Sequence, residues 1–235
     1  MKIINRISKI FAIIVVYIIC AYGYLTAKGF IFTGDVPVLS NSAYAESKYP
    51  KKIDGQLMLS DAIVRSIGDK NAPIHMYVFS SMTCSHCGEF HKEVYPKLKE
   101  EFISKGYLHF VFVHLPTDIL SMQAAKLSYC LPEDKFYDFI EELYKRRDWR
   151  FAKDDTRLNE YAKKYGFSSD DIEKCRNNKK ITSDILLVRE NAITKLGIEA
   201  TPSFIFETSK GKELIVGIDG YSKLKDYLNS KLKEE

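Results

Sequence analysis

The chain has 235 residues, of which 46% are hydrophobic and 28% are charged, and this balance excludes a chain that is disordered throughout. Its 12 glycines and 7 prolines exclude collagen-like and low-complexity structure. The net charge is +4, but four cations and only one acidic residue lie in the first 45 residues. The rest of the chain is therefore nearly neutral, so we expect no nucleic-acid partner.

The N-terminus has the pattern of a signal peptide or a membrane anchor. Lys2, Arg6 and Lys9 precede an apolar run over residues 10–25, which is the order of a positive region followed by a hydrophobic region. This run is intermediate in length between a signal-peptide core and a full membrane span. Cleavage at the small-residue site that ends at Ala45 and retention as an uncleaved anchor both stay open. Either one places the rest of the chain outside the cytoplasm, where disulfides persist.

The next part of the chain contains strand and helix patterns in alternation. Residues 26–50 show no lasting periodicity and are expected to form a tether. Ser60 is expected to cap a short helix that ends near Gly68. Beyond it, the pattern predicts a buried strand over 74–79, a bend over 80–83, a helix from Cys84 toward Ser104 that is kinked at Pro96, and a strand over 108–115.

Helical patterns then dominate up to residue 196, before strands return. Helices are predicted over 118–130, 134–147, 156–165, from Ser169 and over 181–196. The second of these helices carries its large apolar residues on one face: Phe136, Phe139, Ile140, Leu143 and Tyr144. Strands over 203–207 and 213–218 flank a turn at 209–211, and a final amphipathic helix covers 222–232. This order predicts an α/β domain that is interrupted by a helical insertion.

A C-x-x-C motif formed by Cys84 and Cys87 lies on the predicted strand-to-helix turn. At the start of a helix, unpaired N–H groups and the helix dipole favour a negatively charged sulfur. His86 adds a nearby cation when it is protonated, so both effects lower the pKa of Cys84. We therefore expect thiol–disulfide exchange, in which Cys84 is attacked by a substrate thiolate and Cys87 is the less exposed resolving partner.

The other candidate chemistry of this motif is a zinc site. Cys84, Cys87 and His91 have plausible ligand spacing, and His86 is close. However, no second C-x-x-C or H-x-x-x-H completes a set of four ligands, so we expect no metal and no cofactor.

Two further cysteines, Cys130 and Cys175, fall in the predicted helical region, 45 positions apart. A structural disulfide between them would join distant parts of the insertion. The alternative is a second redox pair that regulates the first. No motif or predicted helix start activates either thiol, which favours the structural interpretation.

Several segments together resemble the DsbA-type thiol–disulfide oxidoreductases of the thioredoxin superfamily. They are GDKNAP at 68–73, FSSMTCSHC at 79–87, QAA at 123–125 and GIEATPSF at 197–204. The resemblance implies a thioredoxin fold with an inserted helical subdomain, preceded by the N-terminal signal peptide or anchor. It divides the chain into a leader and tether (1–45), a first thioredoxin part (46–117), the insertion (118–196) and a second thioredoxin part (197–235).

The resemblance also implies the substrate site, the location and the partners. Pro202 is expected in the cis form facing Cys84 and Cys87, which leaves the backbone of Thr201 free to pair with an extended substrate chain. Family members are periplasmic oxidases, so we expect a monomer in the periplasm, with retention on the membrane if the leader is uncleaved. Its expected partners are reduced, unfolded secreted proteins and a membrane partner that reoxidises it.

Two positions depart from the pattern of many relatives. Val78 lies where a buried acid, six residues before the first cysteine, aids proton transfer in those relatives. Thr201, before the key proline, is also seen in disulfide isomerases and reductases, which leaves those activities as alternatives. Residues 26–68 are too short for the dimerisation domain of dimeric isomerases, which favours an oxidase. A non-catalytic binding module with a structural disulfide is the second alternative.

Overall fold

The computed structural model describes residues 30–33, 36–39, 50–60, 63–152, 154–217 and 219–235. The chain divides into two compact units, Met1–Ser47 and Lys48–Glu235, each of which is described by itself. The predicted leader, with its apolar run at 10–25 and the cleavage site at Ala45, lies outside the described residues. Over the part of the chain that is described, no helix combines the length and the hydropathy needed to cross a membrane.

In the first unit, two short strands lie where the sequence predicted a tether without regular structure. β1 (Phe30–Thr33) and β2 (Val36–Leu39) pair antiparallel, with Thr33 opposite Val36. Both strands are rich in aromatic or β-branched residues, and a Gly-Asp dipeptide connects them in the sequence. Such a dipeptide between two short apolar runs is a hairpin signal, but runs of four residues are too short to show a lasting periodicity.

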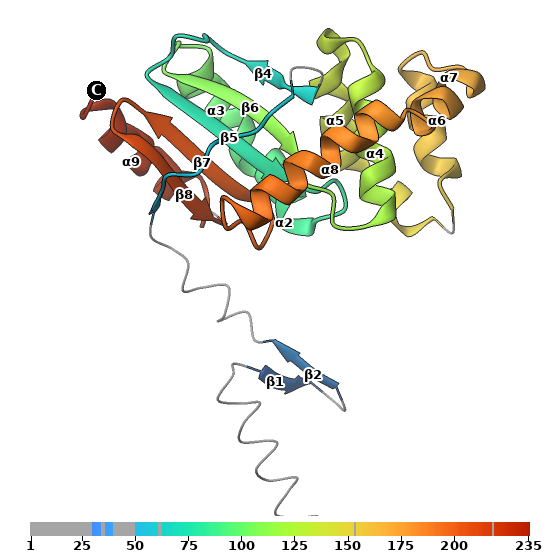
Figure 1. The fold of residues 1–235 in the computed structure, drawn as a ribbon, viewed down its shortest axis with the longest axis horizontal. Helices are drawn as coiled ribbons and strands as arrows, with labels where there is room; N and C mark the ends of the chain where they lie inside the picture. The colour runs from blue at the N-terminus through green and yellow to red at the C-terminus, as the bar shows by residue number, and fades with distance from the viewer. Residues whose placement is uncertain (1–29, 34–35, 40–49, 61–62, 153, 218) are drawn as a thin grey trace, which may run out of the picture. The chain divides into compact units, whose positions relative to one another are not determined.

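The second unit is built on a mixed sheet of six strands in the order β3-β8-β7-β5-β6-β4 (Figure 1). β5 and β6 are parallel, whereas every other neighbouring pair in this sheet is antiparallel. The strands are β3 (Lys51–Ile53), β4 (Arg65–Ile67), β5 (Ile74–Ser80), β6 (Leu108–His114), β7 (Ser203–Thr208) and β8 (Gly211–Val216).

The short helix predicted from Ser60 does not extend to Gly68, because the strand β4 covers Arg65–Ile67. Arg65 lies opposite Phe112 of β6, and the Arg65 guanidinium donates to the carbonyl oxygen of Tyr129 over 3.1 Å. The hydroxyl of Tyr137 donates to the Arg65 carbonyl over 2.8 Å. These partners come from β6 and from the insertion, so tertiary contacts decide the conformation of a segment with weak local preference.

Helices cover both faces of the sheet (Figure 1). One face holds the segment that follows the C-x-x-C motif, together with the C-terminal helix, and α8 crosses the other face. The first set is α2 (Ser85–Glu89), η3 (Phe90–Val94), α3 (Tyr95–Leu98), η4 (Lys99–Ile103) and α9 (Tyr221–Leu232). Pro96 lies in the first turn of α3, where a missing N–H is tolerated.

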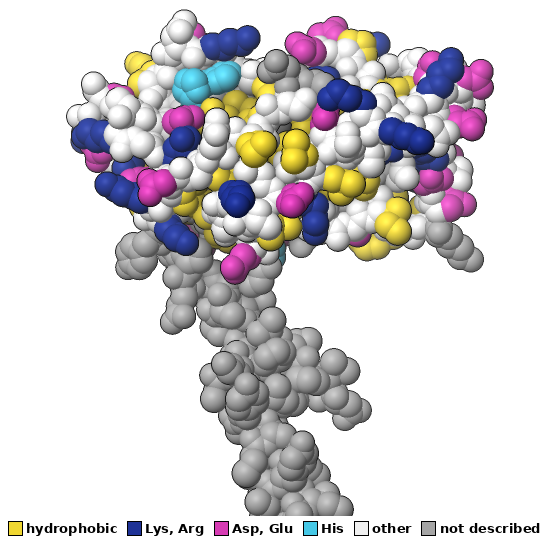
Figure 2. All heavy atoms as spheres, in the orientation of Figure 1, with side chains coloured by type: hydrophobic (Ala, Val, Ile, Leu, Met, Phe, Trp, Pro, Cys, Tyr) yellow, Lys and Arg dark blue, Asp and Glu magenta, His cyan; other side chains and the backbone are white. Residues whose placement is uncertain are grey.

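The helical insertion follows β6 and returns to the sheet through α8. It consists of α4 (Ile119–Cys130), α5 (Glu133–Arg146), the short helix η5 (Asp148–Phe151), α6 (Thr156–Lys164), α7 (Ser169–Arg176) and α8 (Lys179–Thr194). The predicted apolar face of α5 is confirmed, since all five of its large apolar residues are buried. The face that α8 crosses shows apolar side chains among charged ones (Figure 2).

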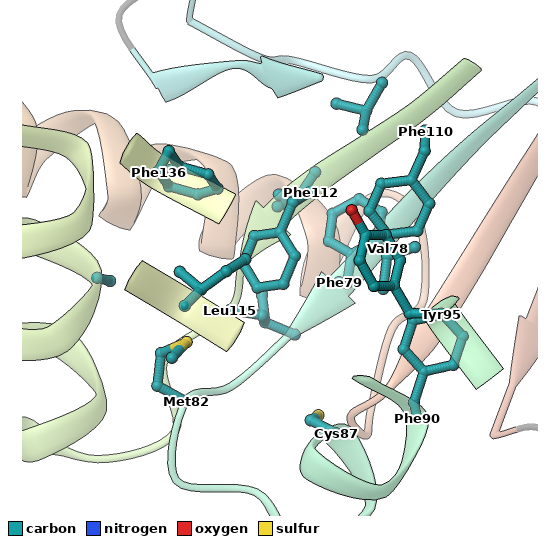
Figure 3. Close-up of a cluster of buried hydrophobic side chains, with 14 of the residues drawn as sticks. Val78, Phe79, Met82, Cys87, Phe90, Tyr95, Phe110, Phe112, Leu115 and Phe136 are labelled. Carbon is teal, nitrogen blue, oxygen red and sulfur yellow. The ribbon is translucent and has the colours of Figure 1, made fainter. Parts of the chain in front are cut away.

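The core lies between the sheet and the helix segment that begins at the C-x-x-C motif (Figure 3). The rings of Phe90 and Phe204 pack 5.0 Å apart, and Val78 is fully buried beside them in the sheet. Burial of one such side chain contributes about 1.5–3 kcal/mol. This packing holds the start of α2 over the end of β5, which is where Cys84 and Cys87 lie.

Candidate functional site

Cys84 caps the N-terminus of α2 with its own sulfur. Its backbone is extended, and its Sγ accepts a hydrogen bond from the backbone N–H of Cys87 over 3.5 Å. Cys84 is half-buried, whereas Cys87 is fully buried one turn further along the helix, and both are free thiols. The predicted placement of the pair at a strand-to-helix turn therefore brings one half-buried and one fully buried cysteine together.

Hydrogen bonds to the sulfur lower the pKa of Cys84 to about 5. The largest cause is the hydrogen bond from the Cys87 side chain, which outweighs the opposing effect of burial. The Thr201 side chain and the backbone N–H groups of Cys87 and His86 add to it. The imidazole of His86 is exposed, and this residue lowers the pKa of Cys84 through its backbone N–H. The role predicted for the His86 side chain stays a prediction.

The pKa of Cys87 is shifted in the opposite direction, well above its ordinary value. Burial is the main cause, and the neighbouring Cys84 adds to it, while hydrogen bonds from the Ser80 side chain and the Ser81 backbone oppose it. At neutral pH the pair therefore holds one thiolate at the surface and one proton on the buried sulfur. This is the division of roles that thiol–disulfide exchange requires.

The loop before β7 reaches the cysteines from a distant part of the sequence. The peptide bond between Thr201 and Pro202 is cis, and Cys84 Sγ lies 3.2 Å from the carbonyl oxygen of Thr201, to which the protonated thiol donates. The hydroxyl of Ser203 donates to the carbonyl of Ala200 over 2.7 Å, and the N–H of Gly217 donates to the carbonyl of Pro202 over 2.9 Å. Both residues predicted for substrate binding therefore lie at the C-x-x-C motif.

The insertion contributes polar residues to the same site that the sequence analysis did not select. The hydroxyl of Thr83, next to Cys84, donates to the carboxylate of Asp118, which also caps α4 by accepting from the Ser121 N–H over 2.7 Å. Burial lowers the pKa of Arg150, while the negative charges of Cys84 and Asp118 oppose this shift. Asp118 was recognisable as a helix cap, but no local pattern indicates its contact with the redox turn.

Tyr144 and Ser80, which the sequence analysis did not select for the site, lie on the side of the buried Cys87. The hydroxyl of Tyr144, from α5, lies 3.1 Å from Ser80 Oγ and 3.1 Å from the Ser81 carbonyl oxygen. The Tyr144 ring stacks on His91 with centroids 4.5 Å apart. No spacing pattern in the sequence links these positions.

His91, a candidate ligand in the zinc alternative, lies in an aromatic cluster. Its ring contacts those of Phe90, Tyr95 and Phe112 as well as Tyr144, and burial lowers its pKa to about 3. Among the described residues, no group of three or more His, Cys, Asp or Glu side chains is placed to hold a metal ion.

Cys130 and Cys175 are bonded to each other, at a Cα–Cα distance of 6.1 Å. Cys130 is the last residue of α4 and Cys175 lies near the end of α7, so the disulfide joins two helices of the insertion. This bond connects positions 45 residues apart.

The thioredoxin family model matches residues 62–216, which is more than half of the chain. Among solved structures, the crystal structure of α-DsbA1 from Wolbachia pipientis is 30% identical with a TM-score of 0.68. The similarity covers 76% of this chain and 95% of that one.

Curated relatives point to the same family. A "Probable disulfide bond formation protein D" of Bacillus anthracis is 28% identical over 51% of this chain and 57% of that protein. A "Putative protein-disulfide oxidoreductase" of Rickettsia conorii is 26% identical over 70% of this chain and 58% of that protein. The chain thus spans less than two thirds of the length of these relatives. The predicted family and fold class are confirmed: the chain belongs to the thioredoxin family, with the α/β fold and helical insertion of the DsbA-type thiol–disulfide oxidoreductases.

Proposed function

We propose that the chain is an exported protein-disulfide oxidase that introduces disulfides into folding periplasmic proteins. The observation that carries the proposal is the opposite shift of two adjacent thiols, with a pKa of about 5 at Cys84 and a raised pKa at Cys87. A stabilised Cys84 thiolate favours the reduced pair, so the oxidised pair is readily reduced by substrate thiols.

The proposed reaction has two exchange steps. A substrate thiolate attacks Sγ of Cys84 in the oxidised pair, the Cys84–Cys87 bond breaks, and its electron pair stays on the Cys87 sulfur, which then takes a proton. A second substrate thiolate attacks the substrate sulfur of the mixed disulfide, and Cys84 leaves as a thiolate. The substrate gains one disulfide and loses two electrons, and the Cys84–Cys87 pair gains them.

Thr201 and Pro202 are proposed to dock the substrate. The Thr201 carbonyl lies beside Cys84 and precedes β7, so an extended chain paired with this backbone would bring its cysteine to the exposed sulfur. The proposed setting is the periplasm, with the protein as a monomer that a membrane partner reoxidises. Reduced secreted proteins are the proposed substrates, and the N-terminal run at 10–25 is the proposed export signal or anchor.

The test is the reduction potential of the Cys84–Cys87 pair, measured by equilibration with glutathione buffers. We expect a value near that of DsbA, about −120 mV. A value near that of thioredoxin, about −270 mV, would contradict the oxidase proposal and favour the reductase alternative. An intermediate value, with faster rearrangement of wrong disulfides than formation of new ones, would favour an isomerase.

The non-catalytic alternative has its own discriminating variant. In a Cys84→Ser/Cys87→Ser double variant, an oxidoreductase loses its biological activity, whereas a binding module retains it.

A further inference from the structure

The buried sulfur of Cys87 must carry negative charge whenever the redox disulfide opens, and Cys87 belongs to the buried hydrophobic cluster drawn in Figure 3. Val78 supplies no polar group from β5. Side chains two residues apart on a strand share a face, so Ser80 points to the same side of the sheet as Val78 and is the last residue of β5. This register places a hydroxyl, rather than a carboxyl group, against the start of α2.

Ser80 connects Cys87 to the helical insertion. Its side chain is fully buried, and its hydroxyl opposes the upward shift of the Cys87 pKa, as a donor facing the thiolate would. Its Oγ also accepts from the Tyr144 hydroxyl over 3.1 Å. Because Ser80 Oγ accepts from the Tyr144 phenol, the Ser80 proton is left to point toward Cys87.

The Tyr144 phenol is held in place by contacts on two sides. Its ring stacks on His91, and its Cδ1 lies 3.6 Å from the position that a Cβ would take on Gly88. The hydroxyl also lies 3.1 Å from the Ser81 carbonyl oxygen, so its single proton is shared between two acceptors at the turn between β5 and α2. Burial raises the pKa of Tyr144, so at neutral pH the phenol keeps the proton that it donates.

We propose that Ser80 and Tyr144 form a hydroxyl chain that stabilises the Cys87 thiolate in place of a buried acid. In this proposal Ser80 donates to the reacting sulfur, whereas Tyr144 is a positioning residue that directs the Ser80 proton toward Cys87. The inference rests on the proposed thiol–disulfide exchange. When the Cys84–Cys87 bond breaks, its electron pair stays on Cys87 and Ser80 donates to it, without a covalent proton transfer along the chain.

Other charged or titratable groups could also change the pKa of Cys87, and the test must separate their effects from that of the hydroxyl chain. Cys84 lies at the start of α2 and His91 on η3, where burial lowers the pKa of the imidazole to about 3 and keeps it neutral. Arg147 follows α5, with its Nη1 3.5 Å from the Gly88 Cβ position, and Arg150 lies on η5. None of these groups is changed by removing the Tyr144 oxygen alone.

The first measurement is the pKa of Cys87, from the ¹³C shift of its labelled Cβ as a function of pH. We would use the full chain with Cys20→Ser and Cys84→Ser, so that Cys87 is the titrating thiol beside the bonded Cys130–Cys175 pair. Adding Tyr144→Phe is expected to raise the Cys87 pKa by about 1, which corresponds to the loss of one hydrogen bond to a charged group. Tyr129→Phe is the matched control, because the buried hydroxyl of Tyr129 accepts from the backbone N–H of His114 instead.

The second measurement is a double-variant cycle in the chain with both redox cysteines. Ser80→Ala and Tyr144→Phe are each expected to slow the reduction of the Cys84–Cys87 disulfide by a small dithiol about tenfold. Because Tyr144 acts through Ser80, the double variant is expected to be no slower than Ser80→Ala alone.

An unchanged Cys87 pKa in Tyr144→Phe would overturn the inference, as would an equal shift in Tyr129→Phe or additive effects in the cycle. If Tyr144→Phe does not fold, Ser80→Ala decides by the same pKa measurement. Loss of thiol exchange in the unaltered chain would contradict the proposed function instead, and the Cys87 pKa would still be measurable.

Discussion

The two cysteine pairs of this chain lie at opposite kinds of helix end. Cys84 caps the N-terminus of α2 and Cys87 lies in its first turn, whereas Cys130 ends α4 and Cys175 lies in the last turn of α7. The positive end of the helix dipole favours a thiolate, and the negative end disfavours one. The pair at the N-terminus is therefore suited to exchange, and the pair at the C-termini to a lasting bond.

The pairs also differ in what surrounds them. Cys84 is half-buried and is contacted by donors from α2 and from the Thr201 loop. Cys130 and Cys175 join two helices of the insertion, and their bond closes a 45-residue separation. Helix position and nearby donors, rather than the presence of two cysteines, therefore separate a reactive pair from a structural one.

The largest difference is expected when one sulfur of the reactive pair is replaced. In Cys84→Ser, thiol–disulfide exchange should fall at least about 1000-fold, because a hydroxyl at position 84 cannot form the disulfide with Cys87 that substrate thiolates attack. The rate of disulfide formation in a reduced substrate protein measures this effect. The free energy of unfolding is expected to change little, and a large loss of stability would mean that Cys84 is structural as well.

Removal of the Cys130–Cys175 disulfide is expected to lower the free energy of unfolding and to leave the reactivity of Cys84 unchanged. Cys130→Ala/Cys175→Ala should lower the free energy of unfolding by about 4 kcal/mol, the chain-entropy value for a loop of this length. Denaturant unfolding measures the loss. The alkylation profile of Cys84 should stay as in the unaltered chain. A changed reduction potential at the Cys84–Cys87 pair would instead support the alternative of a regulatory second redox pair.

A smaller effect is expected in the pH dependence of the Cys84 alkylation rate, which the bonded pair does not share. Because the pKa of Cys84 is about 5, its alkylation rate should stay nearly constant from pH 8 down to pH 6 and fall to half near pH 5. In the unfolded chain the midpoint should lie near the ordinary value, about 8.5. The lowered pKa stabilises the reduced fold above the unfolded midpoint, and this contribution is lost as the pH falls through about 5. A folded-state midpoint above pH 7 would contradict the assigned hydrogen bonds.

Local patterns predicted those parts of the fold that depend on short stretches of sequence. The alternation and apolarity of β5 and β6, the β7–β8 hairpin and the buried face of α5 were all expected, because each pattern spans one or two elements. The segment around Arg65 was predicted wrongly, since three residues of an edge strand carry too little pattern to outweigh a capping signal at Ser60. Its pairing with β6 exists only in the folded chain.

The sequence by itself determined the reactive motif, because helix-start chemistry acts between neighbours: Cys84 caps the helix that contains Cys87. The family resemblance added the Thr201–Pro202 loop as a part of the site. Only the tertiary structure decided which groups enclose the sulfurs, such as Asp118 beside Thr83 and Tyr144 behind Ser80. These partners lie 35 and 64 positions apart along the chain, and single hydrogen bonds over such separations leave no periodic trace in a sequence.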